Sequence, residues 1–479
     1  MSKPVMITAM AVGLASSITG CAVGPDYRKP STTLQPFHAS AALKARGTRA
    51  SAPALGQWWL GFEDPELTRI AQRALHQNLD LAAAMARVEQ ARAAAREAGA
   101  QLLPTANWTA QAARIHQSLE SPIGAVARHL PGFKRDQSDY QVGAAASWEI
   151  DLFGGLRRGA QAASAEAQAA EAQQLGTRIT VVADAADAYL QIRGDQARIA
   201  LAKAQVSTDE HLLDLVERRF RAGLATDREE AQAQALLSEA RASLQPLAID
   251  LAAQLNRLDV LMGAQPGTYA AELNSSHPIL PLPPAIPSNL TPAEVLRRRP
   301  DVIAAERQLA ASNARIGQAI AEYYPKISIS GLLGFESLSA GDLFKAATFQ
   351  PEAVAGLRWR LFDFGKVDAE VAGARGANAE ALALYRRSIL HAAEDVEDAF
   401  TAFVQLEAHG EELRREVAAL KRARDSSQNA YTAGVIPLTD VLEANRQLLS
   451  AQDQLALTRA NTDQAAVQSF RAIGGGWGS

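Results

Sequence analysis

Cysteine is nearly absent from this chain of 479 residues, which contains only one. A single thiol excludes an internal disulfide framework and a cysteine-rich zinc site. Aromatic residues are also sparse, at 6%, and neither sign of charge is in large excess, because the formal net charge is −4. Phosphate recognition needs clustered Lys and Arg, so this balance argues against a protein that binds nucleic acid.

Catalytic signatures are absent as well. The sequence has no His-Glu-x-x-His pair, no glycine loop that cradles a phosphate before a lysine, and no nucleophile elbow. Its eight histidines are scattered along the chain. We therefore expect no enzyme activity, no metal site and no non-covalent cofactor. With 48% apolar and 21% charged residues, the composition is that of a foldable protein.

The single cysteine, Cys21, ends a short apolar segment. Lys3 precedes small and apolar residues up to Gly20, a stretch too short to span a membrane and typical of a signal peptide. The junction Ile18-Thr19-Gly20-Cys21 resembles the bacterial lipobox, in which the cysteine carries diacylglycerol and becomes the first residue. Ala22 then permits sorting to the outer membrane, by the same resemblance. We predict a covalent lipid on Cys21; the alternative is an incidental buried thiol.

The chain contains an internal duplication. Equivalent motifs lie 221 residues apart before the predicted strands, and the offset falls by ten residues after them. The equivalent pairs are Asp80 with Asp301, Pro104 with Pro325, Trp148 with Trp359, and Gly223 with Gly434. Registers this constant indicate two copies of one unit.

Each copy is predicted to start with a helix and continue with a strand hairpin. Asp64 can cap a helix that starts at Pro65, and Thr291-Pro292-Ala293-Glu294 has the residues of a capping box. After the helix, apolar and polar residues alternate with a period of two, most clearly from Tyr140 to Trp148. The hairpins are expected at about 105–150 and 326–362, giving four strands.

Long helices without breakers follow the hairpins, roughly from Gly155 to Phe220 and from Lys366 to Tyr431. Apolar residues recur at spacings of three and four in both, which predicts coiled-coil seams. At ~1.5 Å per residue each helix is roughly 100 Å long, so it needs partners along its length. Glycine ends both helices, and a returning helix follows each.

These boundaries predict six segments. They are a signal peptide at 1–20, an N-terminal lipidated extension at 21–62, a first repeat at 63–263, an extended proline-rich linker at 264–290, a second repeat at 291–473, and a flexible glycine-rich C-terminal tail at 474–479.

Four strands per chain leave open edges and an apolar face with no opposing sheet. An unpaired backbone group costs several kcal/mol in hydrocarbon, so closing such a sheet in a membrane requires more chains. The predicted strands of about ten to twelve residues match the ~9–11 needed to cross a bilayer on a tilt.

Five motifs in order cover essentially the whole chain. They are Cys21-Ala22-Val23-Gly24-Pro25-Asp26-Tyr27, Trp58-Trp59 with Phe62-Glu63-Asp64-Pro65, Asn78-Leu79-Asp80-Leu81, Arg298-Arg299-Pro300-Asp301-Val302, and Gly474-Gly475-Gly476-Trp477. With them the sequence resembles the outer-membrane factor family of tripartite efflux and secretion systems, the TolC/OprM group, and most closely its NodT-type lipoproteins.

The resemblance implies a mostly helical homotrimer. Four strands from each chain form a twelve-stranded barrel in outer-membrane lipid, and the helices continue it as a long α-helical barrel in the periplasm. It also implies an efflux channel that passes drugs or other small toxic compounds to the exterior. The partners implied are a periplasmic adaptor and an inner-membrane pump, which the NodT-type resemblance indicates to be of the resistance-nodulation-division type.

The resemblance assigns functional residues too. The family narrows its periplasmic aperture with a tyrosine and two acidic residues, which match Tyr431, Asp440 and Glu443, and Glu229 is the first-repeat equivalent of Asp440. Ile436 stands where the family has the basic residue that ties the closed aperture. The alternative for these acids is a solvated helix face.

Two further residue sets follow from the expected architecture. The helix turns are expected to dock the adaptor or, alternatively, only to end helices; their residues are Ala222, Gly223, Leu224, Ala433, Gly434 and Val435. The aromatic residues expected at the membrane interface are Trp108, Tyr140, Trp148 and Trp359.

Three alternatives stay open. A type I protein-secretion duct and a metal-efflux duct share the same architecture, because selection rests largely with the pump. A lipid-tethered periplasmic coiled coil without a pore is the alternative from a different class, and it would lack strand hairpins.

Overall fold

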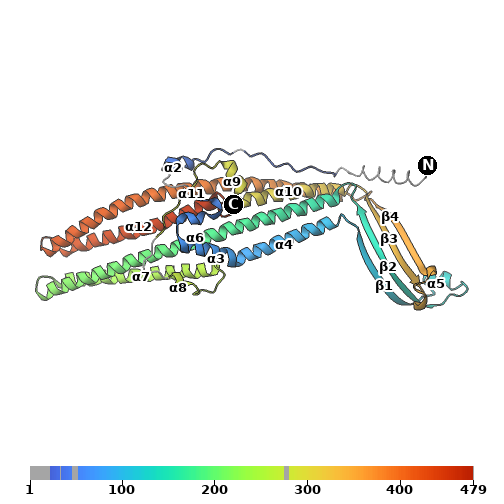
Figure 1. Cartoon of the computed structure of the whole chain (residues 1–479), viewed down its shortest axis with the longest axis horizontal. Coiled ribbons are helices and arrows are strands. Elements are labelled where there is room, and N and C mark those ends of the chain that lie inside the picture. The colour runs from blue at the N-terminus through green and yellow to red at the C-terminus, as the bar shows by residue number, and fades with distance from the viewer. Residues whose placement is uncertain (1–21, 33, 46–51, 274–279, 478–479) are drawn as a thin grey trace. The chain divides into compact units, whose positions relative to one another are not determined.

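The computed structural model describes residues 22–32, 34–45, 52–273 and 280–477 (Figure 1). The chain divides into two compact units. Unit 1 contains the N-terminal residues through Pro30 together with 89–169 and 306–384. Unit 2 contains 31–88, 170–305 and the residues from 385 onward. Cys21 lies outside the described residues, so its lipidation stays a prediction.

Unit 1 holds an antiparallel sheet with strands in the order β1-β2-β3-β4 (Figure 1). The strands are β1 (Thr105–His116), β2 (Asp136–Ile150), β3 (Lys326–Ser337) and β4 (Phe349–Arg358). This confirms two hairpins with four strands. Among the described residues, β1 and β4 each pair along one edge only, so the sheet has two open edges.

The period-two alternation extends across the sheet in register. The apolar face includes Trp108, Ala144, Leu333 and Pro351, which align across the four strands. One residue further along, the other face includes Thr109, Gly143, Gly334 and Gln350. The sheet therefore has one largely apolar face and one more polar face, as expected where the two faces meet different surroundings.

The two hairpins share one register. Thr105 pairs with Ser147 in the first, and Lys326 pairs with Arg358 in the second. These pairs are related by the offsets of 221 and 211 residues found in the sequence. The ten-residue difference lies in the connections, because the first loop is longer and includes helix α5 (Pro122–Ala127).

β4 ends at Arg358, before the predicted boundary at 362. The repeat explains the difference. In β2, residues 148–150 pair with β3 but not with β1. Their equivalents, 359–361, have no strand beyond β4 to pair with in the described part of the chain.

The leading helix of each repeat is divided in two, where one helix was predicted. The first is α3 (Pro65–Gln77) and α4 (Leu79–Ala100); the second is α9 (Pro292–Arg298) and α10 (Pro300–Ala321). Asn78 and Arg299 separate the pairs with extended backbone. The Asn78 amide donates to the Leu261 carbonyl at 2.9 Å, and Arg299 donates to the carbonyl of Ala472 at 3.2 Å. Both breaks are thus tied to the end of the returning helix.

The long helices are α6 (Gly155–Arg221) and α11 (Lys366–Thr432), each of 67 residues. The returning helices are α7 (Asp227–Leu261) and α12 (Leu438–Ala472), each of 35 residues. The predicted helical hairpins are therefore confirmed, with equal lengths in the two repeats. None of the helices in the described part of the chain is both long enough and apolar enough to cross a membrane.

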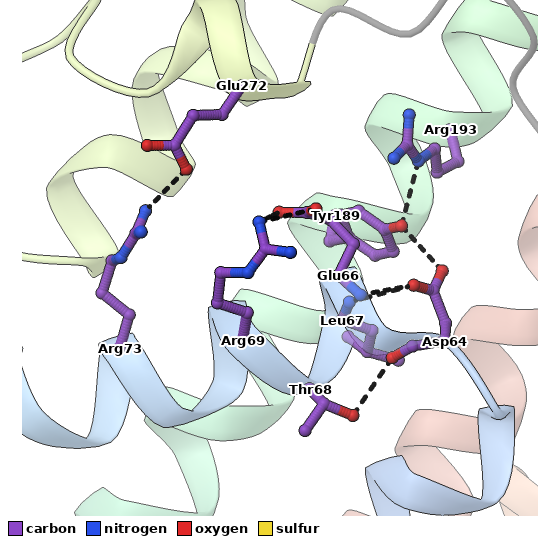
Figure 2. Close-up of polar contacts among 9 residues, drawn as sticks. All are labelled: Asp64, Glu66, Leu67, Thr68, Arg69, Arg73, Tyr189, Arg193 and Glu272. Carbon is purple, nitrogen blue, oxygen red and sulfur yellow. Dashed lines mark hydrogen bonds and ion pairs between the residues drawn. The ribbon is translucent and has the colours of Figure 1, made fainter.

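In unit 2, a polar network docks α3 against α6 (Figure 2). The predicted cap is confirmed: the Asp64 carboxylate accepts from the backbone N–H groups of Glu66 and Leu67. Its other oxygen accepts from the Tyr189 hydroxyl at 2.7 Å, and Arg193 donates to that hydroxyl at 3.0 Å. Burial and this acceptor raise the pKa of Tyr189, so the phenol stays a donor.

The glycine-rich C-terminus is packed rather than flexible through residue 477. The N–H of Gly476 donates to the Leu55 carbonyl at 2.7 Å, and the indole of Trp477 donates to the Arg298 carbonyl at 3.0 Å. A Cβ added at Gly475 would meet the Phe470 carbonyl oxygen at 2.9 Å and the Trp58 ring at 3.0 Å. The glycines are needed for this close approach.

The predicted linker is not continuous. Residues 280–290 form neither helix nor strand, but α8 (Ala270–Leu273) lies in the earlier part. The buried Asp259 carboxylate organises the turn before α8 by accepting from the N–H groups of Gly267, Thr268 and Tyr269. A single side chain therefore orders a segment whose composition suggests a linker.

In unit 1, the residues that follow Cys21 are held by a buried arginine. Arg158 donates to the carbonyl of Val23 at 3.1 Å and forms an ion pair with Asp26 at 2.9 Å. A Cβ on Gly24 would meet the backbone of Gly317 at 2.4 Å, and Gly24 has φ +89°. The segment beyond the predicted lipid site is thus fixed against α6 and α10.

Candidate functional site

The two helix turns in unit 2 have the same backbone geometry. Gly223 and Gly434 have φ values of +72° and +75°. The N–H of Leu224 donates to the Arg219 carbonyl at 2.8 Å, and the N–H of Val435 donates to the Ala430 carbonyl at 2.9 Å. This is the hydrogen bond of a Schellman motif, in which glycine takes the left-handed position.

The returning helices start differently. Thr226 and Glu229 form a capping box that begins α7: the Glu229 carboxylate accepts from the Thr226 N–H at 2.7 Å. Pro437 precedes α12 and provides no side-chain cap. Glu229, predicted as a contributor to the aperture, is therefore engaged in capping its own helix.

An apolar cluster joins the two helical hairpins near their turns. Its fully buried members come from all four helices and are Leu212, Val216, Ala233, Tyr431, Leu438 and Val441. The side chain of Tyr431 is 2% exposed, although its predicted role placed it at the rim of an aperture. In this conformation Tyr431 faces the interior of its own chain.

Arg219 of α6 contacts Tyr431 of α11. Its guanidinium lies 4.7 Å from the centre of the Tyr431 ring, and Nη1 approaches the Tyr431 carbonyl at 3.4 Å. Burial raises the pKa of Tyr431, and its hydroxyl is buried without a hydrogen-bond partner. A cation therefore does meet the tyrosine, but it comes from the first repeat rather than from position 436.

Sequence reasoning missed Arg219 because it lies 212 residues from Tyr431. The signal available in the sequence was weak: the last turn of α6 carries three arginines, Arg218, Arg219 and Arg221. Basic residues at a helix C-terminus are common, because they interact favourably with the helix dipole. Only the packing of the two hairpins identifies the one that reaches Tyr431.

The two carboxylates predicted on α12 are exposed. Asp440 lies in the first turn, and Glu443 follows one turn later and accepts from the Gln447 amide at 2.8 Å. The six residues predicted at the two turns are all exposed; they are Ala222, Gly223, Leu224, Ala433, Gly434 and Val435. Asp440 and Glu443 thus lie on an exposed part of α12 next to the α11–α12 turn.

The predicted interface aromatics occupy equivalent positions in unit 1. The Trp148 indole donates to the Leu102 carbonyl at 2.9 Å, and the Trp359 indole donates to the Tyr323 carbonyl at 2.9 Å. Each tryptophan therefore satisfies a carbonyl just after a leading helix. Trp108 is 72% exposed, and Tyr140 is half-buried.

A two-faced sheet with open edges, combined with paired helical hairpins, is the protomer of an outer-membrane channel that extends into the periplasm. The family model described as "Outer membrane efflux protein" matches residues 70–264 and 291–475, one segment in each repeat. The chain belongs to this family of channel and transport proteins.

Individual relatives match over most of their length. The pyoverdine export outer membrane protein OpmQ of Pseudomonas aeruginosa is 34% identical over 90% of each chain. The toluene efflux pump outer membrane protein TtgF of Pseudomonas putida is 31% identical over 98% of this chain and 96% of its own. The solved structure of the outer-membrane channel OprN superposes with a TM-score of 0.86 at 30% identity, covering 95% of this chain and 100% of that one.

Proposed function

We propose that this chain is the exit duct of a tripartite efflux system for small molecules. It works as a homotrimer anchored by a lipid on Cys21, with a periplasmic adaptor and a resistance-nodulation-division pump. The observation that carries the assembly is the sheet, whose faces differ in polarity and whose two edges are open. Three copies supply twelve strands and close those edges, with the apolar face toward lipid.

The class of substrate is argued from the relatives. Toluene, named for TtgF, and pyoverdine, named for OpmQ, are small molecules rather than proteins. A duct that passes such compounds needs a wide water-filled path and little specific recognition. No group of three or more His, Cys, Asp or Glu side chains that could hold a metal ion occurs among the described residues.

Selection at the aperture is assigned to Asp440 and Glu443. Both carboxylates are exposed near the α11–α12 turn. Repeated in three chains they form two anionic rings, which favour cations and disfavour anions at a constriction. Arg219 takes the place of the missing base by holding Tyr431 between the two hairpins.

Docking of the adaptor is assigned to the two turns. Their exposed small residues allow another backbone to approach closely, and no heavy atom lies within 4 Å of a Cβ added at Gly223 or Gly434. Bulky substitutions there block a partner by occupying the space it needs. Trp148 and Trp359 serve at the membrane boundary, where amphipathic rings commonly lie.

Dye accumulation in a strain that lacks the gene tests this function. Expression of the wild-type chain is expected to lower ethidium accumulation, whereas a variant lacking both hairpins, residues 105–150 and 326–358, is not. Labelled palmitate is expected in the wild-type chain and absent from C21S. A lipidated protein that never changes dye accumulation, even with its adaptor and pump present, would support the tethered coiled coil instead.

A further inference from the structure

The two strand hairpins of unit 1 end in different loops. β1 and β3 begin just after the leading helices, and β2 and β4 end just before the long helices, so the loops 117–135 and 338–348 lie at the other end of the sheet (Figure 1). In an outer-membrane channel whose helices extend into the periplasm, this end faces the outside. The loop 117–135, called the long outer loop below, contains α5 and holds the extra residues of the first repeat.

The apolar face of the sheet ends near the long outer loop. In β1 the alternate residues from Trp108 to Ala112 are followed on this face by Arg114, which donates to the hydroxyl opposite it at 3.2 Å. Tyr140 lies opposite Ala112. From Tyr140 to Trp148 the strand is roughly 26 Å long at ~3.3 Å per residue, close to the ~25 Å apolar band of an outer-membrane barrel. Arg114 therefore lies at the outer boundary of the apolar band.

Aromatic rings mark the same boundary on the second hairpin. Phe335 lies opposite Phe349 in the ladder, with ring centroids 5.5 Å apart. Phe344 of the shorter loop packs against the same ring, with centroids also 5.5 Å apart. Phe335 in turn lies opposite Val142, the neighbour of Tyr140 on the apolar face. Aromatic residues gather where hydrocarbon gives way to lipid headgroups, so the headgroup layer begins beyond these rings.

The two outer loops differ in charge. The shorter loop has one base and one acid, and these two residues, Lys345 and Asp342, form an ion pair with each other. The long outer loop contains one acid, Glu120, and three Lys or Arg residues. Its basic residues are Arg128, Lys134 and Arg135. The first hairpin therefore presents an excess of positive charge at the level of the headgroups, and the second does not.

Two guanidinium groups lie close together at the base of the long outer loop. Arg135 donates from Nε to the carbonyl of Gln117 at 3.0 Å, and both Arg135 and Arg114 lie near enough to Asp136 to interact with its charge. Nδ1 of His116 lies 2.7 Å from the Asp136 carboxylate, which therefore already has a close partner. A guanidinium has five N–H donors, so both arginines keep donors for an anion from outside the chain.

The long outer loop also exposes large apolar side chains on an ordered helix. Ser121 caps α5, and the Ser118 carbonyl oxygen occupies the place that a Cβ on Gly124 would need. The helix is thus packed against the start of the loop through its glycine. Ile123 and Val126 remain 72% and 67% exposed. Apolar groups exposed beside a charged surface indicate a place where a membrane or a partner is bound.

We propose that the long outer loop binds an anionic lipid of the outer leaflet through a phosphate of its headgroup. Arg114 and Arg135 donate to the phosphate oxygens, and Ile123 and Val126 lie at the edge of the acyl layer. The proposal rests on the proposed orientation of the apolar face toward lipid, because Arg114 continues that face. Guanidinium groups match the geometry of phosphate, and basic residues beside apolar ones favour a lipid over a free anion.

Native mass spectrometry of the full-length protein in detergent tests this proposal, with lipid A and phosphatidylcholine as the added lipids. Lipid A carries a net negative charge on its phosphates, whereas phosphatidylcholine is neutral overall. The wild-type protein is expected to retain lipid A in preference. R114Q with R135Q should weaken lipid A binding by about 10- to 30-fold, because each basic residue near an anionic lipid surface contributes about fivefold.

Two control variants separate charge from folding and from general stickiness. R114K with R135K keeps both charges and should keep most of the binding, and the trimer mass in the same spectra shows that each variant is assembled. K345Q removes a base from the shorter loop and should leave lipid A binding unchanged. Equal binding by the wild-type protein and R114Q with R135Q overturns the proposal, as does equal loss in the glutamine and lysine variants.

The apolar residues distinguish a lipid from other ligands. I123S with V126S should weaken lipid A binding, and an equal concentration of inorganic phosphate should not displace the lipid. Unchanged binding by this variant, together with displacement by phosphate, would identify a site for a free anion and overturn the lipid proposal. A photoreactive amino acid in place of Ile123 is expected to label lipid in cells, and labelling of a protein instead would also overturn it.

Dye accumulation with the wild-type chain reports on the proposed function separately. A chain that lowers dye accumulation but shows no preference for lipid A would remove this inference and leave the proposed function intact. A chain that does neither would remove both.

Discussion

The two repeats have the same backbone architecture, but equivalent side chains differ in how deeply they are buried. Their long helices have the same length, and their turns have the same glycine conformation. Yet Tyr431 is 2% exposed, whereas Phe220, at the equivalent position 211 residues earlier, is 40% exposed. The duplicated backbone therefore fixes the geometry, and the substituted residues determine what each surface contacts.

The two long helices also differ in the residues that they bury along the coiled-coil seam. Asp195 and Asp209 on α6 are 0% and 1% exposed. Each accepts one hydrogen bond from a glutamine four residues earlier, and its second oxygen is buried without a partner. The equivalent residues on α11 are Leu406 and Leu420. The first hairpin thus carries buried acids where the second carries leucine.

The largest effect is expected from the contrast between Phe153, covered within the chain, and Phe364, exposed. Phe153 stacks on Tyr324 within the chain, whereas Phe364, its equivalent 211 residues later, is exposed. In the proposed homotrimer F364S removes an apolar side chain worth about 1.5–3 kcal/mol at each of three contacts between copies, so the trimer should dissociate in mild detergent. F362S is the matched control: Phe362 is 91% exposed, but its equivalent, Asp151, bonds only to its own helix start. Equal trimer yields by size-exclusion chromatography with light scattering would contradict this contrast.

A pH difference between the hairpins is the second expectation. Burial, reinforced by Asp250 for Asp195 and by Glu239 for Asp209, raises the pKa of each aspartate to about 6, although the neighbouring glutamines and Arg198 oppose the shift. Raised values mean that the folded hairpin binds protons more tightly than the unfolded chain. The contribution of these two aspartates to stability is therefore fully present below about pH 4 and is lost as the pH rises through about 6.

Hydrogen exchange, corrected for the intrinsic rate, measures this difference. Amides of α6 near Asp209 should lose protection between pH 5 and pH 7.5, more than the α11 amides near Leu420. Asp463 on α12, whose pKa burial raises to about 8, gives the second hairpin a pH dependence of its own at another position. The variant D195L with D209L copies the second repeat at both positions and should remove their share of the dependence, leaving that of Asp187, whose pKa burial raises to about 7. If that variant keeps the full pH dependence, these aspartates are not its cause.

The acids at the second turn give the third expectation. D440N with E443Q should lower the preference for cations in planar bilayers by about two- to tenfold, since a potential of one to two kT changes local ion concentration by that factor. D227N with E230Q removes two acids from the first turn, where no ring is proposed, and should have the smaller effect. Equal shifts in reversal potential would show that the turns contribute alike.

Arg219 and its equivalent, Ala430, give the fourth expectation. R219A removes a cation–π contact worth about 0.5–2 kcal/mol, so exchange around the α11–α12 turn should speed up, and R219K should restore part of the protection. Unchanged exchange around Tyr431 in R219A would mean that the apolar cluster alone holds the tyrosine.

The smallest effect concerns the caps. T226A loses the capping box of α7 and should cost about 1 kcal/mol of local stability, seen as fraying of the first turn of α7 by hydrogen exchange. Thr439 lies near the start of α12 but caps nothing, so T439A should change little. Comparable fraying in both variants would argue against a distinct start for α7.

Much of the fold follows from the sequence because each local signal occurs at the equivalent position of both repeats. The strands near Trp148 and Trp359, the helix starts at Pro65 and Pro292, and both glycine turns have local signals that occur twice. The breaks at Asn78 and Arg299 were missed because their cause is distant: each side chain is tied to a helix end more than 170 residues away.

The site was less predictable for the same reason. Exposure of Asp440 and Glu443 follows from a helix-face pattern, but burial of Tyr431 depends on contacts with the other hairpin. The packed C-terminus shows a further limit, because a run of glycines suggests flexibility when its neighbours are unknown. Trp58 and Phe470 lie so close to Gly475 that no side chain larger than that of glycine fits.

Native mass spectrometry of the detergent-extracted wild-type protein can decide whether three copies form one channel. We expect a complex of three identical chains, each lacking residues 1–20 and carrying a lipid on Cys21. A monomer that stays single across mild detergents would contradict the claim that copies of this sheet close into one outer-membrane channel.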